Sequence, residues 1–200
     1  MKKKILILNY GSGNYSSINK TLRRFNNNVE IGNSKNHIAR ADIIILPGVG
    51  TFPKAMDYMK KISIIKNLNS TIKKGKNILG ICLGMQLLTD CSVEIQNTKG
   101  LKLIKGQTKK LPFENHIGWN NVYFKKKDTF QYLNGKSFFF QHQYYIDTKI
   151  YCEKGFFNIK KNFFTAMIKK KNIVGVQFHP EKSQDAGLDF FKIYFESLND

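Results

Sequence analysis

One cysteine, Cys82, stands between two glycines where the sequence changes from a strand pattern to a helix pattern. Residues 77–81 form a short apolar run typical of a buried strand, and Met85-Gln86-Leu87-Leu88 continues as a helix. A tight turn between the two strains its central residue, and Gly80 and Gly84 leave room beside it because glycine has no Cβ. The pattern predicts a nucleophile elbow, which places Cys82 on the strand-to-helix turn of an α/β fold.

The predicted position also favours a reactive thiol. At a helix N-terminus, unpaired backbone N–H groups and the positive end of the helix dipole favour the thiolate over the thiol. The alternative interpretation is a buried structural cysteine, since free cysteine packs as a small hydrophobic residue. A second site further along the chain favours the catalytic interpretation of Cys82.

That second site is an apolar run, residues 174–178, that ends in His179-Pro180-Glu181. A thiol nucleophile needs a base, and a third group must orient that base. Glu181 can hold one imidazole nitrogen of His179 while the other nitrogen faces the sulfur. A histidine two residues before a glutamate is a weak signal alone and would also suit a surface histidine after a strand. Together with an elbow cysteine it predicts a Cys82-His179-Glu181 triad.

A third segment ends in a glycine-rich turn. Residues 42–46 have the pattern of a buried strand, and Pro47-Gly48-Val49-Gly50 follows. Acyl chemistry at a cysteine builds negative charge on a carbonyl oxygen, and N–H groups of this turn, together with the Leu83 N–H, are candidate donors to it. The alternative is an ordinary strand-ending turn.

The order of elements predicts an α/β fold. Expected strands at 4–8, 42–46 and 77–81 alternate with expected helices at about 16–25 and 62–73, the pattern of a mostly parallel central sheet flanked by helices. Short β-type runs at 121–124, 137–141 and 163–168 predict additional antiparallel strands in the C-terminal half, and a last helix is expected at 185–198. A chain of 200 residues, 42% of them hydrophobic, suits one core, so residues 1–200 are predicted to be a single domain.

These motifs resemble the class I, triad-type glutamine amidotransferases. The resemblance is closest to the glutaminase subunits of imidazole glycerol phosphate synthase, the HisH type, and it spans nearly the whole chain. The segments that carry it, in the family's order, are Asn9-Tyr10-Gly11-Ser12-Gly13-Asn14, Pro47-Gly48-Val49-Gly50, Gly80-Ile81-Cys82-Leu83-Gly84-Met85-Gln86, His116-Ile117-Gly118-Trp119-Asn120 and Gln177-Phe178-His179-Pro180-Glu181-Lys182-Ser183.

The resemblance implies a hydrolytic reaction on L-glutamine. Cys82 would attack the side-chain amide, His179 would move protons and Glu181 would orient His179. A γ-glutamyl thioester would form and ammonia would leave. The ammonia would pass to a β/α-barrel synthase subunit of the HisF type, the other half of a heterodimer in histidine biosynthesis.

The resemblance also assigns the residues around the substrate. Val49, Gly50 and Leu83 match the oxyanion region, and Gln86 matches a position that lines the glutamine pocket. In the family, a flip of the Gly-Val-Gly backbone is thought to complete the oxyanion hole only when the partner is engaged, which is a gated assembly of the site.

Two departures from the family's pattern affect the prediction. Asn9 replaces the family's aspartate, and Gln141 and Gln143 flank His142 where the family usually has a small apolar residue and a serine. Because His142 is retained, we expect the chemistry to survive and His142 and Gln143 to be binding residues. An altered partner is the alternative: a paralogue that supplies ammonia to an amidotransferase building amidino groups on bacterial surface sugars.

The basic composition invites a different interpretation. A net charge of +19 is typical of nucleic-acid binding, but the lysines lie in short scattered clusters without a recognised binding motif. Such lysine use also arises from a biased genome composition, so we expect no nucleic-acid partner. A stand-alone γ-glutamyl hydrolase is a further competing class, which would act without a synthase.

Other features of the composition predict where the protein is located and whether it uses a cofactor. Three cysteines without framework spacing favour a reducing compartment, and a cytoplasmic location is expected. The chain has no run of about 20 apolar residues, so we expect no membrane association. Neither cysteine nor histidine recurs at ligand spacing, so no metal and no other cofactor is predicted.

Overall fold

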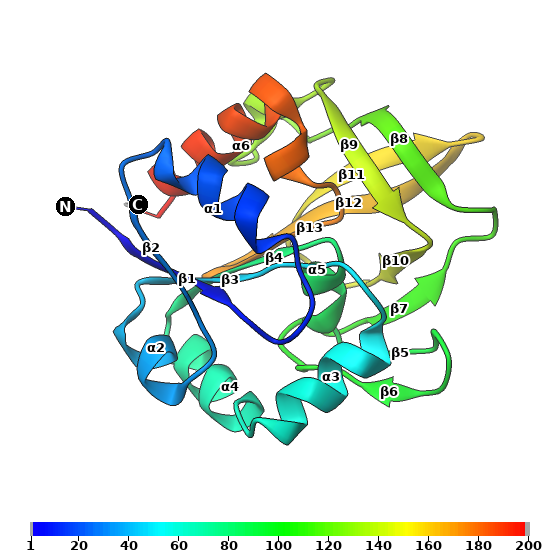
Figure 1. The fold of residues 1–200 in the computed structure, drawn as a ribbon. Coiled ribbons are helices and arrows are strands. Elements are labelled where there is room, and N and C mark those ends of the chain that lie inside the picture. The colour runs from blue at the N-terminus through cyan, green and yellow to red at the C-terminus, as the bar shows by residue number, and fades with distance from the viewer. Residues whose placement is uncertain (1, 199–200) are drawn as a thin grey trace.

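A computed structural model describes residues 2–198 as a seven-stranded sheet with helices on both faces and two smaller sheets beside it (Figure 1). The strands are β1 (Lys4–Leu8), β2 (Asn28–Gly32), β3 (Ile43–Leu46), β4 (Asn77–Ile81), β5 (Cys91–Ser92), β6 (Thr98–Lys99), β7 (Gln107–Lys110), β8 (His116–Asn121), β9 (Ser137–His142), β10 (Tyr144–Asp147), β11 (Glu153–Ile159), β12 (Asn162–Lys170) and β13 (Ile173–Val176). The helices are α1 (Tyr15–Arg23), α2 (Lys35–Arg40), α3 (Phe52–Lys61), α4 (Ile65–Lys73), α5 (Leu83–Leu87) and α6 (Gln184–Glu196), with 3₁₀ turns η1 (Gln131–Leu133) and η2 (Pro180–Lys182).

The main sheet is mostly parallel, as predicted. Its order is β11-β12-β13-β4-β3-β1-β2, and the five strands from β13 to β2 pair in parallel. At the other edge, β12 and β11 are antiparallel additions from the C-terminal half. The predicted fold class, a mostly parallel sheet flanked by helices with added antiparallel strands, is confirmed.

Two apolar cores lie on opposite faces of this sheet. Successive side chains of a strand point to opposite faces, so Ile5 and Ile7 of β1 join one core and Leu6 and Leu8 join the other. Helices α1 and α6 cover the first face, and α2, α3 and α4 cover the second (Figure 1). The central strands β3, β4 and β13 are therefore continuous, largely apolar runs because both of their faces are buried, whereas the edge strand β2 is partly exposed.

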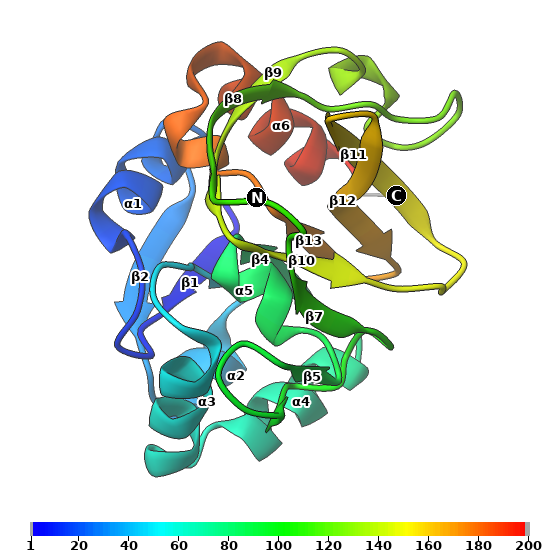
Figure 2. The same cartoon turned by 90° about the vertical axis from the view of Figure 1, so that its right-hand side faces the viewer.

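The two smaller sheets extend the molecule beyond the end of the main sheet where its parallel strands finish. Strands β10, β7, β5 and β6 form one, and the antiparallel pair of β8 and β9 forms the other. Figure 2 views the molecule from this side, with α5 near the centre. In open α/β sheets, ligands bind at the carboxyl ends of the strands, so these additions build walls around the expected ligand site.

Several predicted boundaries were wrong. The strand expected at 121–124 lies at His116–Asn121, and Tyr123 makes only an isolated bridge to Phe156. Helix α3 was missed because a proline and the glycine-rich turn before it resemble loop punctuation, although proline is compatible with a first helical turn. The helix expected from residue 62 begins at Ile65, because Ser63 has a φ of 53° and separates it from α3.

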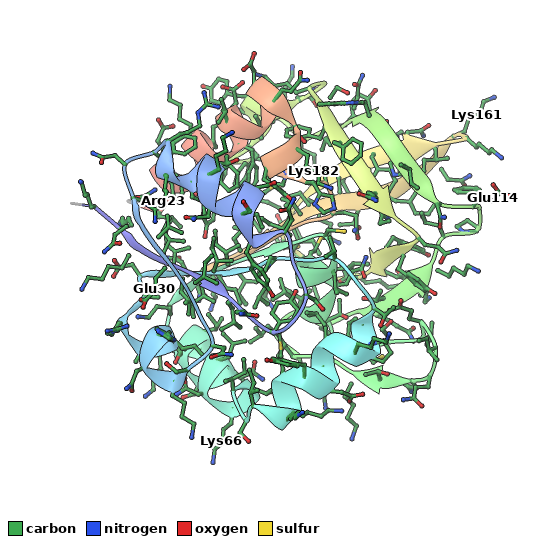
Figure 3. All side chains as sticks on the ribbon, viewed as in Figure 1. Arg23, Glu30, Lys66, Glu114, Lys161 and Lys182 are labelled. Carbon is green, nitrogen blue, oxygen red and sulfur yellow. The ribbon has the colours of Figure 1, made fainter. Side chains whose placement is uncertain are left out.

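Charged side chains are spread widely over the surface. Figure 3 labels six of them, Arg23, Glu30, Lys66, Glu114, Lys161 and Lys182, at separate places around the ribbon. Among residues 2–198, no helix combines the length and apolarity that crossing a membrane requires.

The close approach of α5 to β3 gives a stability prediction. A Cβ added to Gly84 would lie 1.9 Å from the Leu46 carbonyl oxygen, and neither backbone can give way cheaply. We expect Gly84→Ala to lower the free energy of unfolding by about 3 kcal/mol. Denaturant unfolding measures this loss, and the slope of the free energy of unfolding against denaturant concentration should be unchanged. Gly135→Asn is the control, because nothing lies within 4 Å of an added Cβ there and asparagine tolerates its φ of 78°. Equal losses in the two variants would contradict the prediction.

Candidate active site

Cys82 occupies the sharp turn between β4 and α5. Its φ of 52° and ψ of −110° lie in a sparsely populated region, which a non-glycine residue holds only when its surroundings enforce it. The Cys82 N–H donates to the Val176 carbonyl at 2.7 Å, which ties the elbow to the neighbouring strand β13. The residue is 6% exposed. The backbone thus has the strained geometry that the elbow pattern predicts.

His179 and Glu181 form a buried pair beside the elbow. His179 Nδ1 lies 2.9 Å from Glu181 Oε1, and the two side chains are only 2% and 1% exposed. Cys82 lies close enough to His179 to raise the pKa of its imidazole. Because Nδ1 is occupied by the carboxylate, Nε2 is the nitrogen available to the sulfur.

The charges of this group act together. Burial lowers the pKa of His179, but the charge and hydrogen bond of Cys82, and then those of Glu181, raise it to about 10. An imidazolium is therefore favoured at neutral pH. With the sulfur beside it, the pair can attack a carbonyl carbon and then protonate a leaving nitrogen.

Ser183, the last residue of the C-terminal motif, helps to fix His179 in place. The His179 N–H donates to the Phe139 carbonyl at 2.8 Å. The Ser183 hydroxyl donates to the His179 carbonyl at 2.6 Å and accepts from the Phe139 N–H at 3.0 Å. Strand β9 and the turn after β13 are thereby locked together, which holds the imidazole toward the elbow.

A cavity of about 170 Å³ opens directly onto Cys82 and His179. Its lining contains every residue predicted to bind the substrate or the oxyanion; the full set is Gly48, Val49, Gly50, Cys82, Leu83, Gln86, Glu94, Gln141, His142, Gln143, Tyr144 and His179. Glu181 is not in this lining and is hydrogen-bonded to His179 instead. Three strand ends and the β9–β10 corner thus meet around one small space.

The predicted oxyanion donors lie next to each other. A Cβ on Gly48 would be 2.4 Å from the Leu83 nitrogen, so the glycine-rich turn and the elbow are in backbone contact. Gly50 has a φ of 107°, which favours glycine. The Tyr10 hydroxyl donates to the Pro47 carbonyl and anchors the start of this turn. The geometry brings Val49, Gly50 and Leu83 to one side of Cys82.

The departure at Asn9 leaves its local contacts intact. Its side-chain oxygen accepts from the Gly11 N–H at 3.2 Å and from the Tyr15 hydroxyl at 3.1 Å. A carboxylate would accept the same two hydrogen bonds, so asparagine keeps the turn without the charge.

Gln86 and His142 line the cavity, but polar atoms of both side chains are already hydrogen-bonded to protein groups. Gln86 Nε2 donates to the Tyr144 carbonyl at 3.0 Å and to Gln177 Oε1 at 3.1 Å, so Oε1 is the amide atom left to accept from a substrate. His142 has both ring nitrogens in contact with protein groups, His116 and the Tyr144 carbonyl, each at 2.9 Å. The His142 ring therefore lines the cavity in a fixed orientation and has no ring nitrogen free for a ligand.

Sequence reasoning missed Glu94 and Tyr144 in this lining. Glu94 follows the two-residue strand β5, and no motif marks it. Its Oε2 accepts from the Phe52 N–H at 2.6 Å. Burial raises the pKa of Glu94, which that hydrogen bond partly offsets. A carboxylate held at the edge of the cavity is suited to a cationic group of a ligand.

The fold is that of the class I glutamine amidotransferases. Solved structures agree on the fold: PurLQS from Thermotoga maritima matches with a TM-score of 0.75 and 18% identity over 99% of this chain and 100% of that one. A glutamine amidotransferase from Thermotoga maritima matches with a TM-score of 0.69 and 17% identity over 100% of this chain and 85% of that one.

The chain belongs to the class-I glutamine amidotransferase family, whose model matches residues 6–192, and within it to the group of the imidazole glycerol phosphate synthase subunit HisH. The HisH of Listeria monocytogenes serotype 4b is 38% identical over 97% of this chain and 96% of its own length. The HisH of Bacillus mycoides is 41% identical over 94% of this chain and 92% of its own. The predicted family and enzyme class, a glutamine amidotransferase of this synthase type, are thus confirmed.

The pair of buried His142 and half-buried His116 predicts a loss of stability in acid. Burial lowers the pKa of His142 to about 3 and that of His116 to about 4. Between these values and the ordinary 6.5, the unfolded chain binds protons that the folded chain does not, so stability falls as pH drops from 6.5 toward 4. We expect a loss of about 2 kcal/mol, measured by denaturant unfolding across this range. His142→Phe should flatten the dependence, and an unchanged slope in that variant would contradict the assignment.

Proposed function

We propose that this chain is the glutaminase subunit of an imidazole glycerol phosphate synthase, acting as one amidotransferase domain over residues 1–200. The observation that carries the proposal is that Cys82 and His179 line a small cavity while Glu181 holds His179, in a chain whose relatives are HisH subunits. The substrate is L-glutamine. The products are glutamate and ammonia, and the ammonia goes to a synthase subunit.

In the first half of the proposed reaction, the Cys82 thiolate attacks the side-chain carbonyl carbon of glutamine and forms a tetrahedral oxyanion. The N–H groups of Leu83 and of the Val49–Gly50 turn stabilise that oxyanion. As the carbon–nitrogen bond breaks, the His179 imidazolium gives its proton to the nitrogen, which leaves as ammonia. A γ-glutamyl thioester remains on the sulfur.

In the second half, neutral His179 removes a proton from water, which attacks the thioester carbonyl. Collapse of the second oxyanion returns the thiolate and releases glutamate, and His179 is again protonated. Glu181 holds Nδ1 throughout and stabilises the imidazolium, so Nε2 always faces the reacting atoms.

Glu94 and Gln86 are proposed to recognise the amino-acid end of glutamine. Glu94 is the acidic side chain in the lining of the cavity, and an α-ammonium group is a matching partner for it. Gln86 Oε1 is a second acceptor, fixed by the two bonds of its Nε2. His142 and Gln143 complete the wall.

A β/α-barrel synthase subunit of the HisF type is the proposed partner in a heterodimer. The names of the relatives describe a subunit of a synthase. Strand β8, next to the active-site strand β9, also presents two large apolar side chains to solvent: Ile117 is 62% exposed and Trp119 is 50% exposed. Such side chains favour a protein partner at this edge. The reducing cytoplasm is the proposed location, because the three cysteines are unpaired thiols.

The comparisons do not favour the alternative, a supplier of ammonia for surface-sugar biosynthesis. The curated relatives at 37% to 41% identity are HisH subunits. The Gln141 and Gln143 departures lie within the same cavity and leave its geometry complete.

The nucleophile is tested by Cys82→Ala. This variant should reduce glutamate production from glutamine by at least about a thousand-fold, because Cys82 is the cysteine in the cavity lining that the structure describes. Cys152→Ala is the control and should retain the wild-type rate, since Cys152 lies outside the lining. An enzymatic assay for glutamate measures both. Retained activity in Cys82→Ala would refute the proposed mechanism.

The proposed role of Glu94 is tested by Glu94→Gln. Loss of a charge that binds ground state and transition state alike raises KM and leaves kcat nearly unchanged. We expect KM for glutamine to rise about ten-fold. Steady-state kinetics give the two constants, and Glu114→Gln, an exposed change elsewhere, is the control. A fall in kcat at constant KM would contradict this role.

A further inference from the structure

The histidine of the His-Ile-Gly-Trp-Asn motif does not reach the cavity, but hydrogen bonds and aromatic packing hold its ring in place. His116 of β8 is paired directly opposite His142 of β9, and their rings contact through Nδ1 and Nε2 at 2.9 Å. The His116 ring is stacked on Phe140 and Phe157, with centroids 4.6 and 4.9 Å apart. Its position is therefore set by packing as well as by hydrogen bonds.

The hydrogen bonds of this pair can run in only one direction. Asn120 Nδ2 donates to the Asn158 carbonyl at 3.0 Å, which identifies that atom as the amide nitrogen, and it also faces His116 Nε2 at 3.3 Å. His116 Nε2 is then an acceptor, so the hydrogen of His116 is on Nδ1. It is donated to His142 Nε2, and the hydrogen of His142 is on Nδ1.

Low pKa values of both histidines agree with this assignment. Burial lowers the pKa of His116 to about 4. Burial, and then the neighbouring His116, lower the pKa of His142 to about 3. Both rings are therefore neutral at the pH of the reaction, and a neutral imidazole carries one hydrogen that must be on one nitrogen or the other.

The same directed bonds continue from His142 to the nucleophile. His142 Nδ1–H donates to the Tyr144 carbonyl, which also accepts from Gln86 Nε2. The second hydrogen of Gln86 Nε2 goes to Gln177 Oε1, at 3.1 Å. The Gln177 amide is thereby turned so that its Nε2 faces Cys82 Sγ at 3.6 Å. Each amide in this series has one orientation that satisfies its neighbours.

We propose that His116 is a positioning residue for the glutaminase reaction: its Nδ1–H holds His142, and through the Tyr144 carbonyl it fixes the Gln86 and Gln177 amides around the substrate and Cys82. The inference rests on the proposed function for its kinetic consequence, but not for the hydrogen-bond directions. Without the His116 donor, His142 Nε2 becomes a buried acceptor with no partner, and the ring is no longer held against the Tyr144 carbonyl.

Histidine ¹⁵N NMR of the unaltered protein tests the hydrogen-bond directions. The chain has only four histidines, so single substitutions assign every ring. Between pH 6 and 8, both His116 and His142 should be in the Nδ1–H form, with a coupling across the bond from His116 Nδ1 to His142 Nε2. Finding either ring in the Nε2–H form, or titrating near 6.5, would overturn the proposal whether or not the protein hydrolyses glutamine.

Two substitutions test the kinetic consequence. His116→Phe keeps a ring between Phe140 and Phe157 but removes the donor, whereas His116→Asn keeps a donor near the position of Nδ1. We expect His116→Phe to lower kcat/KM for glutamine roughly ten-fold, mainly through KM, and His116→Asn to restore most of it. His37→Phe, a change in α2, is the control.

The outcomes separate the two proposals. Equal activity of folded His116→Phe and the unaltered protein would overturn the positioning role and leave the glutaminase function standing. An equal loss in the Phe and Asn variants would overturn it too, because a merely structural role makes no distinction between them. If His116→Phe does not fold, the NMR result and the Asn variant decide. An unaltered protein that lacks glutaminase activity even with its synthase subunit present would refute the proposed function alone.

Discussion

The active site depends on close backbone-to-backbone contacts around the Cys82 turn, where glycines leave no side chain between the segments. A Cβ on Gly48 would lie 2.3 Å from the Ile81 carbonyl oxygen, and one on Gly80 would lie 2.6 Å from the Gly84 backbone. Gly84 is in turn pressed against the end of β3. These three contacts enclose the Cys82 turn from three sides, which is how a residue with a φ of 52° is maintained. The strained backbone of Cys82 is thus supported by the packing of the sheet.

Around this turn, the functional groups are oriented by directed hydrogen bonds. Glu181 fixes His179 from one side, and Ser183 fixes the backbone of His179 from another. The amides of Gln86 and Gln177 do the same for the space beside the sulfur. Such preorganised groups stabilise developing charge without reorganising during the reaction, which is the usual source of catalytic power in a site of this kind.

Local patterns in the sequence were sufficient to predict the fold class, the elbow and the glycine-rich turn, whereas the resemblance to the family supplied Gln86, His142 and Gln143. Apolar runs identified β1, β3 and β4, and the glycines around Cys82 marked the elbow. Glu94 and Tyr144 were not predictable, since Glu94 follows the short strand β5 and Tyr144 begins the short strand β10, and the placement of both strands depends on long-range pairing. The pairing of His116 with His142 was equally hidden, because it arises from the register of β8 on β9. Short motifs identify reactive residues, whereas the register between strands determines which of them lie side by side.

The most direct test of the account is the rate of glutamate production from glutamine by the purified chain. The rate is measured for the chain alone and with the proposed HisF-type partner of the same organism, the cyclase subunit, with the ligand of that subunit bound. A glutaminase subunit whose oxyanion turn is completed by its partner should be slow alone and strongly stimulated in the complex. Stimulation that depends on both Cys82 and the cyclase would support the account. A glutaminase rate that is indifferent to the cyclase would contradict it.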